Sequence, residues 1–222
     1  MITKLPRWVW FGSAALGLIA GVVNAVGFLS FQHQGVTHLT GSTTLLGIAI
    51  AEGQLADATH LLGVAGSFLL GCIISGSLVQ DSALKLGRRY GIALAAESVL
   101  LLCAVPLLKR ADFLGAYLTS CACGLQNGMV STYSGAVLRT THVTGAFTDL
   151  GIAIGQRLAG VVLNTRRVQL CLMLIGGFLL GSLLGAAGYA RFGYNTLYFP
   201  ALATGAVGLV YAVYRRQSQL PA

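Results

Sequence analysis

Apolar segments separated by short polar loops run through the whole chain. Eight can be marked, at about residues 8–30, 39–51, 60–80, 90–108, 113–135, 143–156, 168–188 and 195–214. Six are long enough to cross about 30 Å of hydrocarbon at about 1.5 Å per helical residue. The other two, 39–51 and 143–156, would extend only about 20 Å and are predicted to be half-length helices. The pattern therefore predicts an all-α, multi-pass membrane protein.

The low charge of the chain excludes a water-soluble domain. Of its 222 residues, 55% are hydrophobic and 9% are charged, whereas soluble domains carry about 25% charged residues. The net charge of +8 comes from short basic clusters between the apolar segments, which is typical of charges that orient a membrane protein. We therefore expect a lipid bilayer and no nucleic acid as partner. All five cysteines lie inside apolar segments, so we expect neither a disulfide framework nor a metal site.

The two short segments are copies of one another. Residues 37–50 and 141–154 are identical at ten of 14 positions, at a constant offset of 104. Upstream, Gly-Val-Val-Asn (21–24) corresponds to Gly-Leu-Gln-Asn (124–127), and downstream, residues 67–71 correspond to 177–181. The chain is thus predicted to consist of two membrane repeats, 1–110 and 111–222, each with the order long, short, long, long.

The basic residues indicate how the repeats are oriented. If the short segments enter the membrane and return, 11 of the 14 Lys and Arg residues lie on the side of the termini; if all eight segments cross, nine do. The positive-inside rule favours the first arrangement, with both termini in the cytoplasm. Each repeat then has three spanning helices and one broken or re-entrant helix. Because three is odd, the repeats are predicted to be inverted, which is typical of transport pathways.

The duplicated Thr-His-x-Thr-Gly element marks the predicted site. A short helix that starts near the membrane midplane directs its free N–H groups and positive dipole end into the protein. Two such ends would form a polar site able to hold an anion or a carboxylate, and polar side chains on the first long segments would contribute to it. The alternative is that these groups only satisfy packing hydrogen bonds. The predicted substrate-binding residues are Asn24, Thr37, His38, Thr40, Gly41, Ser42, Gln126, Asn127, Thr141, His142, Thr144 and Gly145.

Two carboxylates lie inside apolar segments. Glu97 is flanked by small residues, and Asp149 lies about one turn into the second short segment, where the first has Leu45. An acid within the membrane is costly and is a functional candidate by default. Both are therefore predicted proton-coupling residues, and His38 and His142 are candidates for a proton relay. The alternative for each acid is a buried structural hydrogen bond.

The duplicated motifs also resemble a known family. The motifs are Gly21…Asn24-Ala-Val-Gly-Phe, His38-Leu-Thr-Gly-Ser-Thr, Gly124-Leu-Gln-Asn127-Gly and Thr140-Thr-His-Val-Thr-Gly145. They are similar to motifs of the YoaK-like family of bacterial membrane proteins, catalogued as a domain of unknown function (DUF 1275). The resemblance covers essentially the whole chain. It implies a bacterial inner-membrane protein with about six membrane helices, and it implies no substrate.

The sequence therefore predicts an inner-membrane transporter or channel-like protein for a small solute or ion, proton-coupled through Glu97 or Asp149. Its site is expected at the interface of the two repeats. The alternative is a non-transporting membrane scaffold or accessory subunit, whose polar motifs serve only helix packing. Signatures of soluble enzymes such as Gly-x-Ser-x-Gly are missing, so no enzyme and no cofactor is expected. A homo-oligomer is compatible with these predictions.

Overall fold

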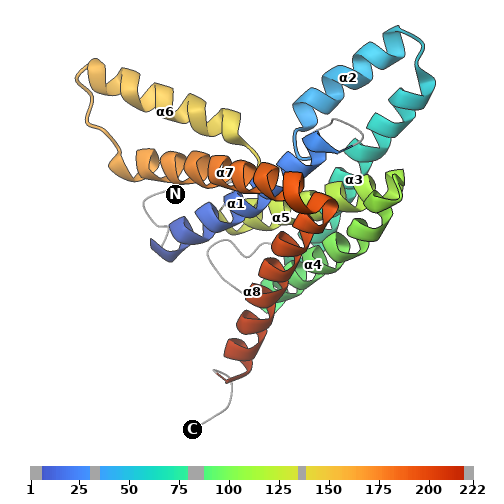
Figure 1. Cartoon of the computed structure of the whole chain (residues 1–222). Helices are drawn as coiled ribbons and strands as arrows, with labels where there is room; N and C mark the ends of the chain where they lie inside the picture. Colours follow the sequence, from blue (N-terminus) through green and yellow to red (C-terminus); the bar gives the residue numbers. More distant parts are fainter. Residues whose placement is uncertain (1–6, 31–35, 80–87, 135–138, 218–222) are drawn as a thin grey trace.

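The computed structural model describes residues 7–30, 36–79, 88–134 and 139–217, and its regular structure over these ranges is helical (Figure 1). The prediction of an all-α fold is confirmed for this part of the chain. In chain order the helices are α1 (Arg7–Leu29), α2 (Leu39–Ala51), α3 (Leu55–Val79), α4 (Arg88–Lys109), α5 (Phe113–Ser134), α6 (Val143–Leu158), α7 (Thr165–Phe192), the 3-10 helix η2 (Gly193–Leu197) and α8 (Tyr198–Gln217).

Four stretches of the described helices are long and apolar enough to span the membrane, and together they contain all or most of five of the six segments predicted to do so. Among the described residues, the candidate spans are Trp10–Leu29, Leu55–Val79, Arg89–Lys109 and Thr165–Tyr211, the last of which contains α7, η2 and α8. The sixth segment, α5, is not among them. Its 22 residues would reach about 33 Å, so composition and not length sets it apart. Most of α5 is buried inside the protein, where side chains need not be apolar to match lipid.

The half-length helices of the sequence prediction are α2 and α6. α2 occupies the predicted residues, whereas α6 continues two residues past its predicted end. At about 1.5 Å per residue they reach about 20 and 24 Å, which is short of the hydrocarbon core. Just beyond each helix stands a glycine with positive φ, 72° at Gly53 and 85° at Gly160, which allows the chain to reverse at once. Each short helix then packs along the long helix that follows it, α2 on α3 and α6 on α7.

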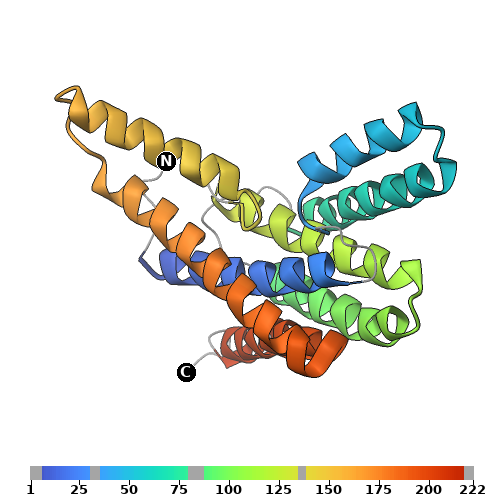
Figure 2. The ribbon, with the colours of Figure 1, turned by 45° about the horizontal axis from the view of Figure 1, so that its top comes forward.

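The two hairpins formed in this way point in opposite directions. The tip between α2 and α3 lies at one end of the molecule in Figure 1, together with the turn between α4 and α5. The tip between α6 and α7 lies at the opposite end, on the side of the molecule where α1 begins, and Figure 2 shows the same separation from a second direction.

Each half packs its first long helix against a long helix of the other half. α1 lies along α7, which follows the second short helix, and α5 lies along α3, which follows the first short helix. Glycines make both contacts close, because a Cβ at Gly21 would overlap the Phe178 carbonyl and one at Gly124 would overlap the Phe68 carbonyl. These are corresponding positions, with offsets of 103 for the glycines and 110 for the phenylalanines. Such small residues let membrane helices approach closely. The repeat in the sequence is therefore also a repeat of tertiary contacts, and the two halves are interleaved.

The bundle is completed by α4, which packs against α5 and α8. Leu101 of α4, Leu125 of α5 and Leu197 of η2 are among its largest fully buried side chains. The boundary predicted between the repeats falls in the turn between α4 and α5, where Ala111 has a φ of 55°.

Candidate functional site

A cavity of about 440 Å³ lies between the two halves of the chain. α1 and α4 of the first half and α5 and α8 of the second half line it. Its walls are apolar and include the aromatic side chains of Phe11, Tyr90, Tyr133 and Tyr211. The rings of Tyr90 and Tyr133 meet edge to face, with 5.6 Å between their centroids. Because small-molecule sites enclose about 300–1,000 Å³, the cavity is large enough for a small ligand with an apolar body.

A buried polar pair follows the inner end of the cavity. Leu94 of α4 and Val130 of α5 line the cavity, and Glu97 and Gln126 lie one turn further along the same faces of these helices. Gln126 Nε2 donates a hydrogen bond to Glu97 Oε1 at 2.9 Å, and both residues are 2% exposed. Among the described residues, Glu97 Oε2 has no hydrogen-bond partner. The structure thus brings together two residues that the sequence analysis singled out separately.

The surroundings of Glu97 offer little compensation for a negative charge. The Cys123 thiol of α5 lies close enough to interact with it electrostatically, and the neighbouring Ser98 Oγ donates instead to the Ala201 carbonyl of α8 at 2.6 Å. Within the described ranges, no Lys, Arg or His forms an ion pair with Glu97. Burying an ionised carboxylate without a cation is unfavourable. The position beside Oε2 is therefore suited to a proton or to another cation.

The segment that leads into α2 is held by hydrogen bonds. Thr37 Oγ1 donates to Asn24 Oδ1 of α1 at 2.6 Å. Ser120 Oγ of α5 lies within hydrogen-bond distance of the carbonyls of Val36 (3.2 Å) and Val64 of α3 (2.9 Å). Thr37, Asn24 and Ser120 are all buried. Two long helices, α1 and α5, therefore hold the start of the first short helix.

The corresponding segment before α6 lacks these bonds. Asn127 corresponds to Asn24, but its buried Oδ1 has no partner in the described structure. Ser120 corresponds to Gly17, which has no hydroxyl group. Thr140 is completely buried, and its Oγ1 is also without a partner there. Because unsatisfied buried groups are unfavourable, the start of the second short helix is the less firmly anchored of the two.

The two histidines of the repeated element lie against its glycines. A Cβ at Gly41 would come within 2.6 Å of His38 Nδ1, and one at Gly145 within 2.5 Å of His142 Nδ1. Each ring therefore folds back over the first turn of its helix, where glycine leaves room for it. Both histidines are exposed. This gives the element a structural role, and direct substrate contact by its residues stays a prediction.

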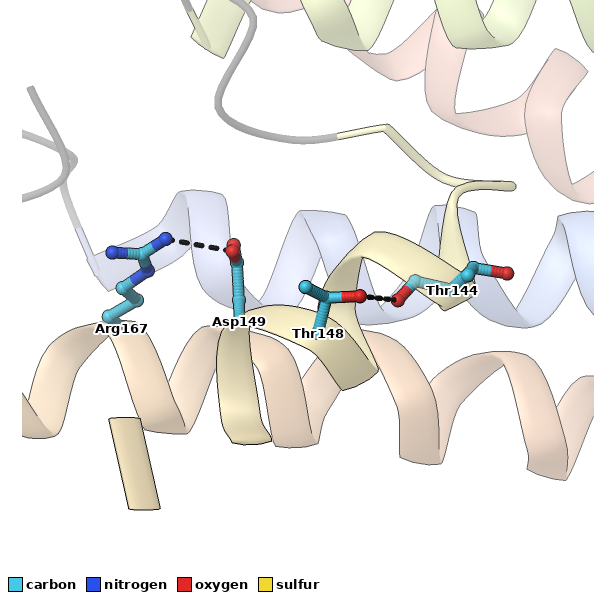
Figure 3. A network of polar contacts seen from close by, with 4 residues as sticks. All are labelled: Thr144, Thr148, Asp149 and Arg167. Carbon is cyan, nitrogen blue, oxygen red and sulfur yellow. Dashed lines mark hydrogen bonds and ion pairs between the residues drawn. The ribbon is translucent and has the colours of Figure 1, made fainter. Parts of the chain in front are cut away.

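Asp149 is paired with a cation, as Figure 3 shows. Arg167 Nη2 of α7 lies 2.8 Å from Asp149 Oδ1 of α6, and the two side chains are 39% and 41% exposed. One residue earlier, Thr148 Oγ1 donates to the Thr144 carbonyl at 3.0 Å. The two acids predicted for proton coupling thus have different surroundings, because Asp149 has a compensating charge and Glu97 does not.

The structure does not bring the two Thr-His-x-Thr-Gly elements into contact. In the described part of the chain, α2 contacts α3 and α6 contacts α7, and the two hairpins diverge (Figure 1). The groups that gather between the halves are instead Glu97, Gln126 and the aromatic walls of the cavity. These walls were not among the site residues predicted from the sequence. The spacing of Tyr90, Leu94 and Glu97 at i, i+4 and i+7 is the signal that would have placed them on one helix face.

No group of three His, Cys, Asp or Glu side chains in the described ranges is placed to hold a metal ion. The sequence predicts that the whole chain has no metal site, and this stays a prediction.

Comparison with known proteins places the chain in a family. The sequence model of a family described as "Protein of unknown function (DUF1275)" matches residues 13–210. The UPF0700 transmembrane protein YoaK of Bacillus subtilis (strain 168) is 28% identical over 148 residues, which cover 64% of this chain and 66% of that protein. No solved structure matches the chain. Since the family match includes nearly all of the helical bundle, the chain belongs to the DUF1275 family of YoaK-like membrane proteins.

Proposed function

We propose that this protein is a transporter or channel-like protein for a small solute or ion, with its site in the cavity between α1, α4, α5 and α8. The observation that carries the proposal is the buried Glu97–Gln126 pair at the inner end of that cavity. Helix packing alone does not require it, because well-packed apolar residues often stabilise a core as well as buried charged groups do. A carboxyl group with one unpartnered oxygen beside a cavity suits the handling of protons or cations.

The proposal includes two inverted repeats in the bacterial inner membrane, each with three spanning helices and one re-entrant helix. Support comes from the hairpin tips, which lie at opposite ends of the molecule (Figures 1 and 2). Further support comes from the corresponding glycine contacts of α1 with α7 and of α5 with α3. The distribution of basic residues favours a cytoplasmic position for both termini.

A closed counterpart of the cavity favours a carrier over an open channel. It lies between α1, α4, α5 and η2 and has a free volume of about 10 Å³, which is no more than one water molecule requires. At an offset of 103, its residues 26, 27 and 30 correspond to residues 129, 130 and 133 of the large cavity. One cavity is therefore open where its symmetry equivalent is closed, as in one of the two states of an alternating carrier.

We assign proton coupling to Glu97 in preference to Asp149. Proton release from a carboxyl group becomes dependent on the solute when the solute supplies the compensating positive charge. Asp149 already has such a charge from Arg167. Glu97 has none in the described structure, so its ionisation is the one that an arriving cation would favour.

Proteoliposomes that contain a pH-sensitive dye test this function. Potassium, chloride, phosphate and choline are applied outside in turn, each with and without an imposed pH gradient. We expect at least one of them to move protons only when the protein is present, and Glu97→Gln to abolish that movement. The control is Glu52→Gln, which removes an exposed carboxyl group beyond α2. Folded protein that moves neither protons nor solute with any of these four, and none with a more apolar organic cation such as tetraethylammonium, would contradict the proposal.

A scaffold or accessory subunit is the second candidate, and a separate observation favours it. Thr40 and Thr44 on α2 and Thr144 and Thr148 on α6 are exposed, on helices that contact only their own hairpin partner within the described structure. An uncovered polar stripe on a membrane helix suits another protein or a second copy of the chain. Disulfide crosslinking between copies that carry Thr44→Cys, combined with a lack of flux, would favour this function.

A further inference from the structure

We propose that the large cavity binds a lipophilic monovalent cation, an organic cation whose charge is surrounded by apolar groups, in exchange for the proton of Glu97. The inference names the substrate class of the proposed transporter. It rests on the proposed function for the transport step, whereas the binding step can be measured without transport.

The walls of the cavity select the body of the ligand. The described side chains that line it are apolar, aromatic or hydroxyl-bearing, and none of these is charged. A strongly hydrated ion such as potassium would lose its water shell there without gaining ligands. An organic cation with a large apolar surface loses little hydration. The cavity is lined by the aromatic side chains of Phe11, Tyr90, Tyr133 and Tyr211, and aromatic rings attract a positive charge over their faces.

Glu97 determines the sign of the charge that the ligand must carry. It lies three residues beyond Leu94 on α4, about 4.5 Å further along the helix axis, and its Oε2 is buried without a partner among the described residues. A cation at the inner end of the cavity would provide the compensating charge that the carboxylate lacks. An anion of the same shape would find no such partner. Arg89, next to Tyr90, is exposed, but a basic residue at this end follows from membrane orientation alone.

The other helices around α4 do not compete for this role. From α5, Gln126 and the Cys123 thiol face Glu97. α3 carries Asp57 and His60 in its first two turns, and the His60 ring lies against α5, 4.4 Å from the Phe113 ring. η2 contains no charged residue or histidine, and the residues of α8 before Arg215 contain none either. Glu97 is thus the acid that a cation in this cavity would meet.

The exchange balances in charge. In the empty site the carboxyl group of Glu97 carries its proton, so the buried region is neutral. When the cation enters, the O–H bond breaks, the proton leaves to solvent, and the carboxylate and the cation form a neutral pair. One proton is released for each cation bound, and the reverse step returns it. Cation and proton therefore compete for one carboxylate, which is the requirement for exchange transport.

Binding to the detergent-purified full chain tests the inference with two probes of nearly equal shape. Tetraphenylphosphonium carries a positive charge and tetraphenylborate a negative one. We expect the dissociation constant of the cation to fall about tenfold for each unit by which the pH is raised, because one proton is displaced on binding. This dependence should hold over the pH range in which Glu97 is protonated in the empty protein. In weakly buffered solution, one proton should appear for each cation bound. The anion should bind at least tenfold more weakly than the cation and release no protons.

Variants at Glu97 decide whether this carboxyl group is responsible. Glu97→Gln should weaken cation binding at least tenfold and remove its pH dependence, whereas Glu97→Asp should retain the pH dependence. Glu52→Gln, at an exposed position, should behave like the unaltered protein. Circular dichroism and size-exclusion chromatography confirm folding. If Glu97→Gln does not fold, proton release by the unaltered protein and by Glu97→Asp still decides the question. Cation binding that is independent of pH, or equal binding of the anion, would overturn the inference.

The two proposals fail in different ways. If the cation binds and releases a proton but no solute drives protein-dependent proton flux in proteoliposomes, the binding site stands and the transport function fails. If another solute drives proton flux while tetraphenylphosphonium does not bind, transport stands and the lipophilic-cation site fails.

Discussion

Two adjacent glycines of α7 provide a matched test of the packing between the halves. A Cβ at Gly177 would lie 2.5 Å from the carbonyl oxygen of Ala14 on α1, whereas a Cβ at Gly176 would have no atom within 4 Å. Ordinary contact begins at 3.4 Å, so Gly177→Ala requires a local separation of 3.4 − 2.5 = 0.9 Å between α1 and α7. The obstructing atom belongs to the backbone, so no side-chain rotation relieves the clash.

The expected magnitude follows from comparing the two substitutions. Both place Ala in the interior of the same helix, so the gain in helix propensity, about 1 kcal/mol at most, is common to both. The difference between them is then the clash itself. Overpacking of this kind costs about 1–3 kcal/mol, and a gap of about 0.5–1 Å also forfeits a quarter to a half of the local dispersion energy. We expect Gly177→Ala to be less stable than Gly176→Ala by about 1–3 kcal/mol.

Equilibrium unfolding in mixed micelles, with increasing sodium dodecyl sulfate and circular dichroism as the signal, measures the two free energies. Gly176→Ala should equal or exceed the unaltered protein in stability, and Gly177→Ala should unfold at a lower mole fraction of denaturing detergent. If the two variants agree within about 0.5 kcal/mol, α1 and α7 do not make the close backbone contact, and the two halves are not interleaved through it.

Three further predictions concern the hydrogen bonds, the ion pair and the topology. Asn24→Ala should lower the free energy of unfolding by about 1–3 kcal/mol, because it leaves the buried Thr37 hydroxyl without its acceptor. Asn127→Ala should lower it less, since the Asn127 Oδ1 has no partner in the described structure. Equal losses in the same unfolding assay would contradict this difference. A double-mutant cycle of Asp149→Asn and Arg167→Ala in the same unfolding assay should give an interaction free energy below about 1 kcal/mol, because the two side chains are about 40% exposed. A larger interaction free energy would mean that this pair is buried in the assembled protein. Single cysteines at Gln54 and Gly160, in a chain with its five cysteines replaced, should react with a membrane-impermeant maleimide from opposite sides, and labelling from one side would exclude inverted repeats.

Several features of the fold and site could be predicted from the sequence because they depend on local patterns. Segment lengths predict which helices are half-length, and the predicted bounds of α2 are those of the structure. Glu97 and Gln126 could each be singled out, because a polar residue inside an apolar segment is conspicuous by itself. The two Thr-His-x-Thr-Gly elements could be aligned from the sequence because their residues are nearly identical. Their separation in space could not be predicted, because it depends on where each hairpin leaves the bundle.

The sequence by itself determined that this is a helical, internally duplicated chain of the membrane, because charge, apolar run length and repeat identity are properties of neighbouring residues. Only the tertiary structure decided that Glu97 bonds to Gln126, 29 residues away, and that Asp149 pairs with Arg167 on the next helix. It also decided that four helices from the two halves enclose a cavity with Glu97 beyond its inner end. These arrangements depend on which helix faces meet, and close contacts such as those of Gly21 and Gly124 with the opposite half determine that.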